Sequence, residues 1–216
     1  MEKILSEIIQ HKLIAIVRGI ENEKMLSLVQ SLKYGGISCV EITFDHASAD
    51  GIEQTSNSIR MVKNEFGSDV LLGAGTVLTP AQVDIAQQAG ASFILSPNTD
   101  VQVIKRSKEL GLISMPGAFT PSEAVLAWNN GADIVKIFPV SQVGPSYIQS
   151  LKGPLAHMRF SAVGGVNEKN AAEFLKAGSC CLGVGGNLVS KKLIDAGDFH
   201  KIEQLAREYV QAIANI

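Results

Sequence analysis

Short apolar runs recur along the chain at regular spacing, and this repeat constrains the fold more than any other feature. Eight runs rich in Val, Ile, Leu, Ala and Phe begin 20 to 31 residues apart. Most are nearly continuous apolar stretches, which is typical of strands in a parallel sheet covered on both faces. The runs are LIAIVR (13–18), CVEITF (39–44), VLLGAGT (70–76), SFILS (92–96), LISMP (112–116), IVKIFP (134–139), RFSAV (159–163) and CLGVG (181–185).

The segments between these runs have the length and punctuation of helices. Thr79-Pro80 and Thr120-Pro121 each provide a capping threonine and a proline suited to the first helical position, and Glu123 completes a capping box. Six of the predicted helices stop at a glycine, a common helix terminator. The predicted helices span residues 21–34, 51–66, 79–90, 100–110, 120–131, 167–177 and 199–214.

The alternation of strands and helices favours a closed barrel. Eight units in 216 residues average 27 residues each, which suits a compact (β/α)8 barrel of the TIM type. An open, doubly wound parallel sheet is the structural alternative. The sequence MEKILSEIIQHK (1–12) predicts an extra amphipathic helix ahead of the first strand. With no linker or low-complexity tract in between, we expect residues 1–216 to form one domain.

Charge and cysteine content exclude several classes of protein. The net charge is −2, from 19 Lys and Arg against 21 Asp and Glu, so no broad basic surface is available for a nucleic acid. No apolar run approaches the 18 or more residues that a membrane span needs. Cys39, Cys180 and Cys181 form neither a disulfide framework nor a zinc-ligand spacing. We therefore expect a cytoplasmic protein with reduced thiols and no metal site.

Lys136, in the run IVKIFP, is the strongest single indication of chemistry. In a barrel, functional residues lie at the C-terminal ends of the strands, and the neighbours of Lys136 are all apolar. An apolar site lowers the pKa of a lysine and frees its neutral amine to attack a carbonyl. The alternative is a structural lysine that snorkels to solvent or pairs with Glu41.

Glu41 is the second indication, because it also interrupts an apolar run, CVEITF. A barrel interior would bring it near Lys136. There it is a candidate proton shuttle, or else half of an inert buried ion pair.

Other polar and glycine positions lie late in the runs. Arg18 ends the first run. Its guanidinium can bind a carboxylate with two hydrogen bonds, or it can simply be exposed to solvent. Thr43 and Thr76 occupy similar positions late in their runs. His46 lies in the loop after Glu41, where it is a candidate for a substrate contact. Glycines after the last two runs suit a phosphate or carboxylate held by backbone N–H groups, or simply tight turns. They are Gly164, Gly165, Gly183, Gly185 and Gly186.

A set of motifs resembles one known family across almost the whole chain. The motifs are EITF (41–44), GAGT (73–76), SPN (96–98), MPG (115–117), TPSE (120–123), KIFP (136–139), GGV (164–166) and GVGG (183–186). In order and spacing they resemble the KDPG/KHG aldolases, class I pyruvate-dependent lyases. That family acts on 2-keto-3-deoxy-6-phosphogluconate (KDPG) and 4-hydroxy-2-oxoglutarate (KHG). The resemblance implies a (β/α)8 barrel, a homotrimer, and no metal or cofactor.

The resemblance also implies roles for individual residues. Lys136 would form a Schiff base with the keto group of pyruvate or of the substrate, and Glu41 would be the general acid and base. Other positions would hold parts of the substrate. They are Arg18 and Thr76 for the pyruvate carboxylate, Pro97 and Phe138 for the apolar wall beside the imine, and Gly164, Gly165, Gly185 and Gly186 for the distal end.

Three positions depart from the pattern of the best-known members. Val163 stands where a threonine is frequent, Gly186 where a serine contacts phosphate, and Asp45 where some members have an arginine. Each change removes a donor or a positive charge, so we expect weaker binding of a phosphorylated substrate. The aldehyde half is thus left open among KDPG, its galactonate epimer, 4-hydroxy-2-oxoglutarate and a non-phosphorylated sugar acid.

Two other functions remain alternatives. A phosphosugar epimerase or isomerase on the same barrel would use the glycine loops but leave Lys136 without a covalent role. A non-catalytic sugar-acid binding protein would be consistent with the altered distal residues.

Overall fold

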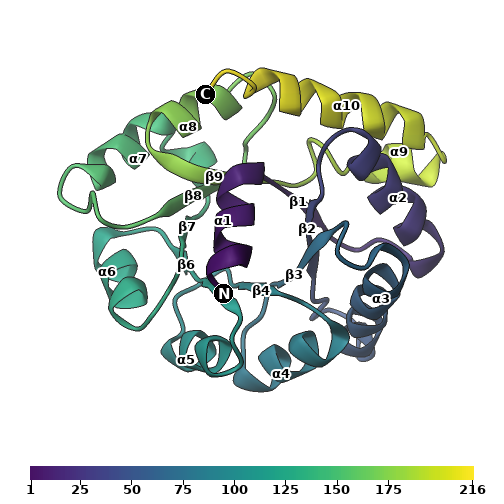
Figure 1. Ribbon diagram of the computed structural model, residues 1–216, viewed down its shortest axis with the longest axis horizontal. Coiled ribbons are helices and arrows are strands. Elements are labelled where there is room, and N and C mark those ends of the chain that lie inside the picture. The colour runs from purple at the N-terminus through teal and green to yellow at the C-terminus, as the bar shows by residue number, and fades with distance from the viewer.

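All strands of the protein run parallel in one sheet that curls into a nearly closed barrel (Figure 1). The computed structural model covers residues 1–216. Neighbours in the sheet follow the order β5-β4-β3-β2-β1-β9-β8-β7-β6. The strands are β1 (Leu13–Val17), β2 (Cys39–Thr43), β3 (Leu71–Gly75), β4 (Phe93–Leu95), β5 (Ile113–Met115), β6 (Gly117–Ala118), β7 (Val135–Ile137), β8 (Phe160–Val163) and β9 (Ser179–Val184).

Strand β5 lies within the predicted run 112–116, and a ninth short strand that was not predicted, β6, follows directly after Pro116. Met115 of β5 is in register with β4, and Gly117 of β6 is in register with Lys136 of β7. One continuous segment therefore contacts both neighbours and joins the two ends of the sheet. Because the first strand also pairs with the last, β1 with β9, the sheet is a barrel and the doubly wound alternative is wrong.

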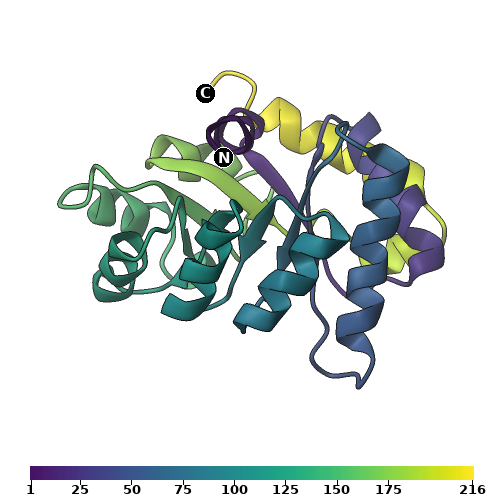
Figure 2. The ribbon, with the colours of Figure 1, turned by 60° about the horizontal axis from the view of Figure 1, so that its bottom comes forward.

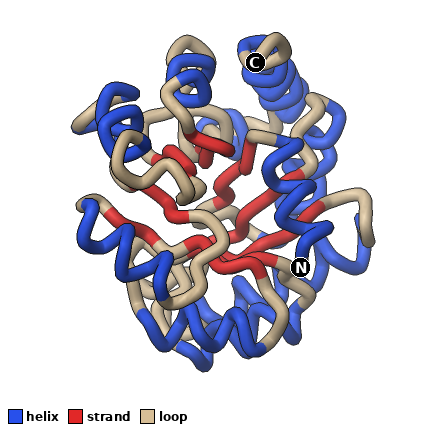
Figure 3. The backbone as a smooth tube through the Cα atoms, turned by 60° about the vertical axis from the view of Figure 1, so that its left-hand side comes forward, coloured by secondary structure: helices blue, strands red, loops and turns tan.

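All helices except the first surround the barrel on its outer side, as Figures 1 and 3 show. The helices are α1 (Glu2–His11), α2 (Asn22–Tyr34), α3 (Gly51–Phe66), α4 (Pro80–Ala89), α5 (Val101–Glu109), α6 (Pro121–Asn129), α7 (Pro145–Lys152), α8 (Ala171–Lys176), α9 (Lys191–Asp195) and α10 (Phe199–Ala212), with a 3-10 turn at Val140–Gln142. None of them is long and apolar enough to cross a membrane.

The local signals for helix starts differ in their outcome. The threonine caps at Thr79 and Thr120 are confirmed, and Thr120 forms the predicted capping box with Glu123. Helix α8 begins at Ala171, later than predicted. The side chain of Asn167 accepts hydrogen bonds from the backbone N–H groups of Lys169 and Asn170, and these bonds hold a turn in place of the first helical residues. Helices α7 and α9 are not among those predicted.

Two apolar layers stabilise the barrel. The larger one lies between the sheet and the outer helices. The smaller, the inner cluster, fills the barrel itself and consists of Ile8, Ile14, Cys39, Phe93, Leu95, Ile113, Met115, Ile134 and Cys181. Helix α1 lies across the N-terminal end, where Figures 1 and 2 show it over the centre of the ring, and Ile8 is fully buried there. The interior is thus filled from that end, and polar groups can meet solvent only at the opposite end.

Candidate active site

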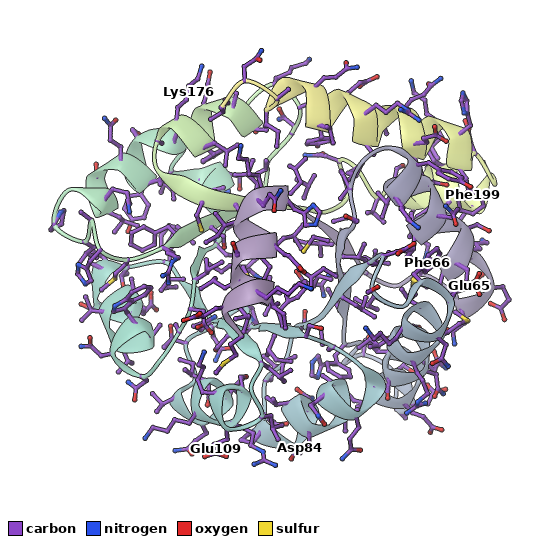
Figure 4. All side chains as sticks on the ribbon, in the orientation of Figure 1. Glu65, Phe66, Asp84, Glu109, Lys176 and Phe199 are labelled. Atoms are coloured by element: carbon purple, nitrogen blue, oxygen red, sulfur yellow. The ribbon has the colours of Figure 1, made fainter.

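Lys136 and Glu41 are the only charged side chains that are buried. Lys136 is 6% exposed and Glu41 is 1% exposed. Other charged side chains, such as Asp84, Glu109 and Lys176, lie on the outer circumference (Figure 4). Because a lone buried charge is costly, a pair of them at the centre of the molecule points to chemistry rather than to packing.

Both charged side chains point into the barrel. Residues two apart on a strand share a face, and the residues two before them, Cys39 and Ile134, belong to the inner cluster. Lys136 and Glu41 therefore lie above that apolar cluster, at the end of the interior nearest the C-terminal mouth. No salt bridge joins them, since no nitrogen of Lys136 lies within 4.0 Å of a carboxylate oxygen. The two side chains therefore form no direct salt bridge, although each charge still shifts the pKa of the other.

The surroundings of Lys136 favour its neutral form. Burial lowers the pKa of the amine; the carboxylate of Glu41 opposes this shift, and the guanidinium of Arg18 adds to it. The Nζ atom lies 4.9 Å from the centroid of the Phe138 ring, which adds to its apolar surroundings. The amine is thus more nucleophilic near neutral pH than an exposed lysine.

The surroundings of Glu41 have the opposite effect on its pKa. Burial raises the pKa of the carboxyl, and the positive charges of Lys136 and Arg18 partly oppose that shift. The carboxylate extends over Gly75 of β3, so that a β-carbon at that position would overlap Oε1. Its other oxygen, Oε2, is buried and accepts no hydrogen bond from the protein. A carboxyl with a raised pKa and a free oxygen suits general acid and base catalysis.

Arg18 and Thr76 lie together at the mouth. Nη2 of Arg18 donates to Oγ1 of Thr76 over 3.1 Å. Thr76 has a φ of 56°, which is unusual for a β-branched residue and is often found at functional sites. Nε2 of His46 donates to the carbonyl oxygen of Thr76 over 2.8 Å. These residues line a cavity of about 360 Å³, together with Gly19, Thr43, Phe44, Asp45 and Ala47.

Pro97 and Phe138 follow the ends of β4 and β7. A β-carbon on Gly117 would overlap the carbonyl of Pro97, so only glycine allows β6 to approach the end of β4 this closely. Phe138 follows Lys136 by two residues, and its backbone N–H donates to Ala118 over 3.1 Å. Phe138 is therefore fixed by the ladder while its ring stands beside the amine.

Local packing requires glycine in the loop after β8 but not in the loop after β9. Gly164 and Gly165 have positive φ values, 92° and 86°, and a β-carbon on Gly165 would lie 2.5 Å from Cβ of Ser141. They let this loop pack against the 3-10 turn after β7, and Ser141 N–H donates to Gly164 over 2.8 Å. Around Gly185 and Gly186, by contrast, added β-carbons would meet nothing within 4 Å. Packing therefore explains Gly164 and Gly165, whereas Gly185 and Gly186 face open space.

Two residues that depart from the family pattern and carry a side chain, Val163 and Asp45, differ in burial. Val163 is 3% exposed and lies against Gly183, where a β-carbon would come within 2.8 Å of its Cγ2. Asp45 is exposed and lines the mouth cavity.

Two buried hydroxyls lie inside the barrel, and the sequence predicted a role for neither: Thr43 was only placed among the polar residues late in the runs, and Ser161 was missed. Ser161 of β8 is in register with Lys136, and Thr43 of β2 follows Glu41 by two residues. Neither hydroxyl has a hydrogen-bond partner in the protein. The spacing of two residues is the signal in the sequence that could have given Thr43 a role beside Glu41.

A larger cavity of about 700 Å³ adjoins the mouth but lies between α2 and α3. It shares Gly19, Thr43 and Asp45 with the mouth cavity and contains neither Lys136 nor Glu41. The chemistry is therefore assigned to the barrel interior and its mouth, not to this larger cavity.

Comparison with known proteins identifies relatives over most of the chain. A family model described as KDPG and KHG aldolase matches residues 4–205. The 2-dehydro-3-deoxy-6-phosphogalactonate aldolase of Escherichia coli (strain K12) is 38% identical over 177 residues, which are 82% of this chain and 83% of that protein.

Solved structures show the same fold. A native KDPGal structure matches with a TM-score of 0.84 and 36% identity, covering 94% of each chain. A KDPG aldolase from Legionella pneumophila, with pyruvate captured at low pH as a covalent carbinolamine intermediate, matches with a TM-score of 0.84. It is 27% identical and covers 94% of this chain and 96% of that one.

Proposed function

Because the chain belongs to the KDPG and KHG aldolase family, we propose that Lys136 is the Schiff-base lysine of its reaction. The protein is a class I, pyruvate-dependent aldolase, a lyase that cleaves a 2-keto-3-deoxy sugar acid to pyruvate and an aldehyde. The observation that carries the residue assignment is the pair of unbridged buried charges, Lys136 and Glu41, at the C-terminal end of the barrel interior. An epimerase would leave that lysine without a covalent role.

The reaction starts at the amine of Lys136. Its neutral form attacks C2 of the substrate, and loss of water gives an imine that is protonated on nitrogen. The protonated imine withdraws electrons, so the bond between C3 and C4 can break once the C4 hydroxyl loses its proton to Glu41. The aldehyde leaves and an enamine remains. Protonation of the enamine at C3, followed by hydrolysis of the imine, releases pyruvate and restores the amine.

The pyruvate half is assigned to the residues around the mouth. Arg18 and Thr76 hold the carboxylate, because a guanidinium and a hydroxyl in mutual contact offer donors to both carboxylate oxygens. Pro97 and Phe138 form the apolar wall beside the imine, where exclusion of water protects it from early hydrolysis.

The distal half is assigned to Gly164, Gly165, Gly185 and Gly186, whose backbone N–H groups are the donors that these loops can offer an anion. Val163, Asp45 and Gly186 offer no positive charge or hydroxyl there. The substrate name of the Escherichia coli relative specifies a 6-phosphate. We therefore expect this chain to accept phosphorylated acids with a modest preference.

Kinetics on matched substrates test the distal assignment. KDPG, its galactonate epimer and both dephosphorylated forms would be compared by kcat/KM. We expect the phosphate to contribute less than about a hundredfold, since each missing charge-assisted contact costs about 1.5–3 kcal/mol. A larger preference would contradict the weakened distal pocket and leave the catalytic assignment intact.

Borohydride trapping tests the central assignment. Protein incubated with pyruvate and borohydride is expected to gain one reduced adduct, mapped by peptide mass spectrometry to Lys136. Lys136→Ala should gain none, whereas Lys105→Met, a change at an exposed lysine on α5, should react like the parent chain. If folded parent protein forms no adduct yet binds sugar acids, the non-catalytic binding protein becomes the better explanation.

Three further expectations belong to this proposal. The chain forms a homotrimer, which light scattering would test. It acts in the cytoplasm, which localisation of a tagged chain would test. It needs no metal or cofactor because the imine is itself the electron sink, so activity after exhaustive chelation should be unchanged.

A further inference from the structure

The hydroxyl of Thr43 is buried without a partner. The residue is 4% exposed, and Oγ1 makes no hydrogen bond with the protein. A buried hydroxyl without a partner costs free energy, and threonine differs from the apolar valine by little else. The backbone carbonyl of Thr43 already accepts a hydrogen bond from the hydroxyl of Thr55, so the Thr43 hydroxyl is not needed to satisfy it. Local structure therefore gives no reason for threonine here.

Thr43 and the Glu41 carboxylate lie at one level of the barrel. Thr43 follows Glu41 by two residues on β2, so both side chains point inward. Gly75 of β3 is the register partner of Thr43, and the Glu41 carboxylate occupies the space over that same glycine. Oε2 of Glu41 is the other buried oxygen on β2 without a hydrogen bond.

Thr43 also borders the mouth cavity, with Arg18 and Thr76. We propose that the hydroxyl of Thr43 and Oε2 of Glu41 bind the same oxygen, the one through which Glu41 exchanges protons with the substrate. That oxygen is the C4 hydroxyl during cleavage or a water molecule during protonation of the enamine. Thr43 donates to it, and it donates to the carboxylate, so its proton points at Glu41.

The proton transfers balance along this path. In cleavage, the C4 hydroxyl gives its proton to Glu41 while the electrons of the C3–C4 bond move into the imine. In the protonation step, Glu41 returns a proton to the shared oxygen as that oxygen gives one to C3 of the enamine. Thr43 keeps its own proton throughout and acts by orienting the shared oxygen.

The experiment compares Thr43→Val, which keeps the shape and removes the hydroxyl, with Thr43→Ser, which keeps the hydroxyl. Ser107→Ala is the matched control, a buried hydroxyl on α5 that bonds only to Val103 within its own helix. Three rates are measured for each variant: pyruvate release from the sugar acid, deuterium exchange into the methyl group of pyruvate, and borohydride trapping at saturating pyruvate. Thermal unfolding is followed in parallel.

We expect Thr43→Val to slow pyruvate release by about tenfold or more, the cost of one lost hydrogen bond to a reacting group. Trapping at saturation should be complete, and the melting temperature should be equal or higher. Thr43→Ser and Ser107→Ala should retain cleavage rates close to that of the parent. If deuterium exchange falls with cleavage, the shared oxygen includes a water molecule. If only cleavage falls, it is the C4 hydroxyl.

The inference rests on the proposed function, and the design separates their failures. A parent chain that neither traps nor exchanges pyruvate would overturn the proposed function. An active parent with an equally active Thr43→Val variant would overturn the inference alone. Equal losses in Thr43→Val and Thr43→Ser would also overturn it, because the hydroxyl would then not be the active feature.

Discussion

The carboxylate of Glu41 occupies the space in front of Gly75, where any other residue would place its β-carbon. The two residues are on neighbouring strands, β2 and β3, and the glycine leaves room for the acid to reach the level of Thr43. A residue with no side chain thus determines where the proposed proton carrier can lie. This explains the second glycine of GAGT (73–76) by packing against a functional group.

Replacing Gly75 by alanine tests that relationship. The added β-carbon overlaps Oε1 of Glu41, so the carboxylate must move, and we expect kcat to fall by about tenfold to a hundredfold. Gly153→Ala, at the end of α7, is the control, since its β-carbon would lie 3.5 Å from its nearest neighbour. Steady-state kinetics of both variants, with circular dichroism, provide the measurement. An unimpaired Gly75→Ala enzyme would show that the position of Glu41 is not critical.

Replacing Lys136 by methionine should abolish activity and stabilise the fold. We expect kcat to fall by on the order of 10⁴ or more, because no imine can form. Burial lowers the pKa of Lys136, so the unfolded chain binds more protons than the native one between that pKa and 10.5. The parent chain therefore gains stability as pH rises through this window. The stability advantage of Lys136→Met should be about 1 kcal/mol or more at pH 7 and should shrink toward pH 10.5.

Urea unfolding of the parent and Lys136→Met between pH 6 and about 10 would measure that difference. A stability difference that grows with pH would contradict a lowered pKa. A less stable methionine variant at every pH would mean that the lysine contributes net stability to the fold.

Replacing Glu41 by glutamine separates binding from proton transfer. We expect kcat to fall by about 10² to 10⁴, the usual value of a general acid or base, while pyruvate still forms a trappable imine with Lys136. The pKa of Glu41 is raised, so its contribution to stability is present below its ordinary value of 4.5 and is lost as pH rises through the folded pKa. The stability of Glu41→Gln relative to the parent should thus increase from pH 4.5 upward and then level off. A difference independent of pH would argue against the raised pKa.

His46→Ala tests the hydrogen bond to the carbonyl of Thr76. Without that donor, the unusual backbone conformation of Thr76 loses support, and the hydroxyl that contacts Arg18 is less well placed. We expect the pyruvate concentration for half-maximal methyl exchange to rise about threefold to tenfold, the value of one ordinary hydrogen bond, with little change in the maximal rate. His200→Ala, on the outer helix α10, should behave like the parent chain. An unchanged half-maximal concentration would show that His46 does not support this contact.

The positions of most strands and the two buried charges could be predicted from the sequence for the same reason. An apolar run indicates a buried strand, and a single charged residue within it indicates a charge in apolar surroundings. Lys136 and Glu41 each interrupt such a run. Capping at Thr79 and Thr120 was predictable because it depends on residues within one turn.

Features that depend on contacts across the barrel were not predictable. His46 and Thr76 are 30 residues apart, and no local pattern indicates that they share a hydrogen bond. The missing partner of the Thr43 hydroxyl is visible only when all neighbours are known. Helix α7 has only eight residues, beginning with Pro145, which are too few for a clear helical period, so the sequence did not predict it.

Helix α1 has a consequence for chemistry that takes place at the other end of the barrel. Its apolar side chains, with Ile8 at their centre, cap the inner cluster on which Lys136 and Glu41 rest. A barrel without that cap would admit water from below, and a hydrated interior would return the amine of Lys136 to the protonated state of an ordinary lysine. The proposed nucleophile is thus kept reactive partly by helix α1, which lies at the end of the barrel opposite the mouth. Variation in that segment would change the pH range in which the protein works before it changed what the protein binds.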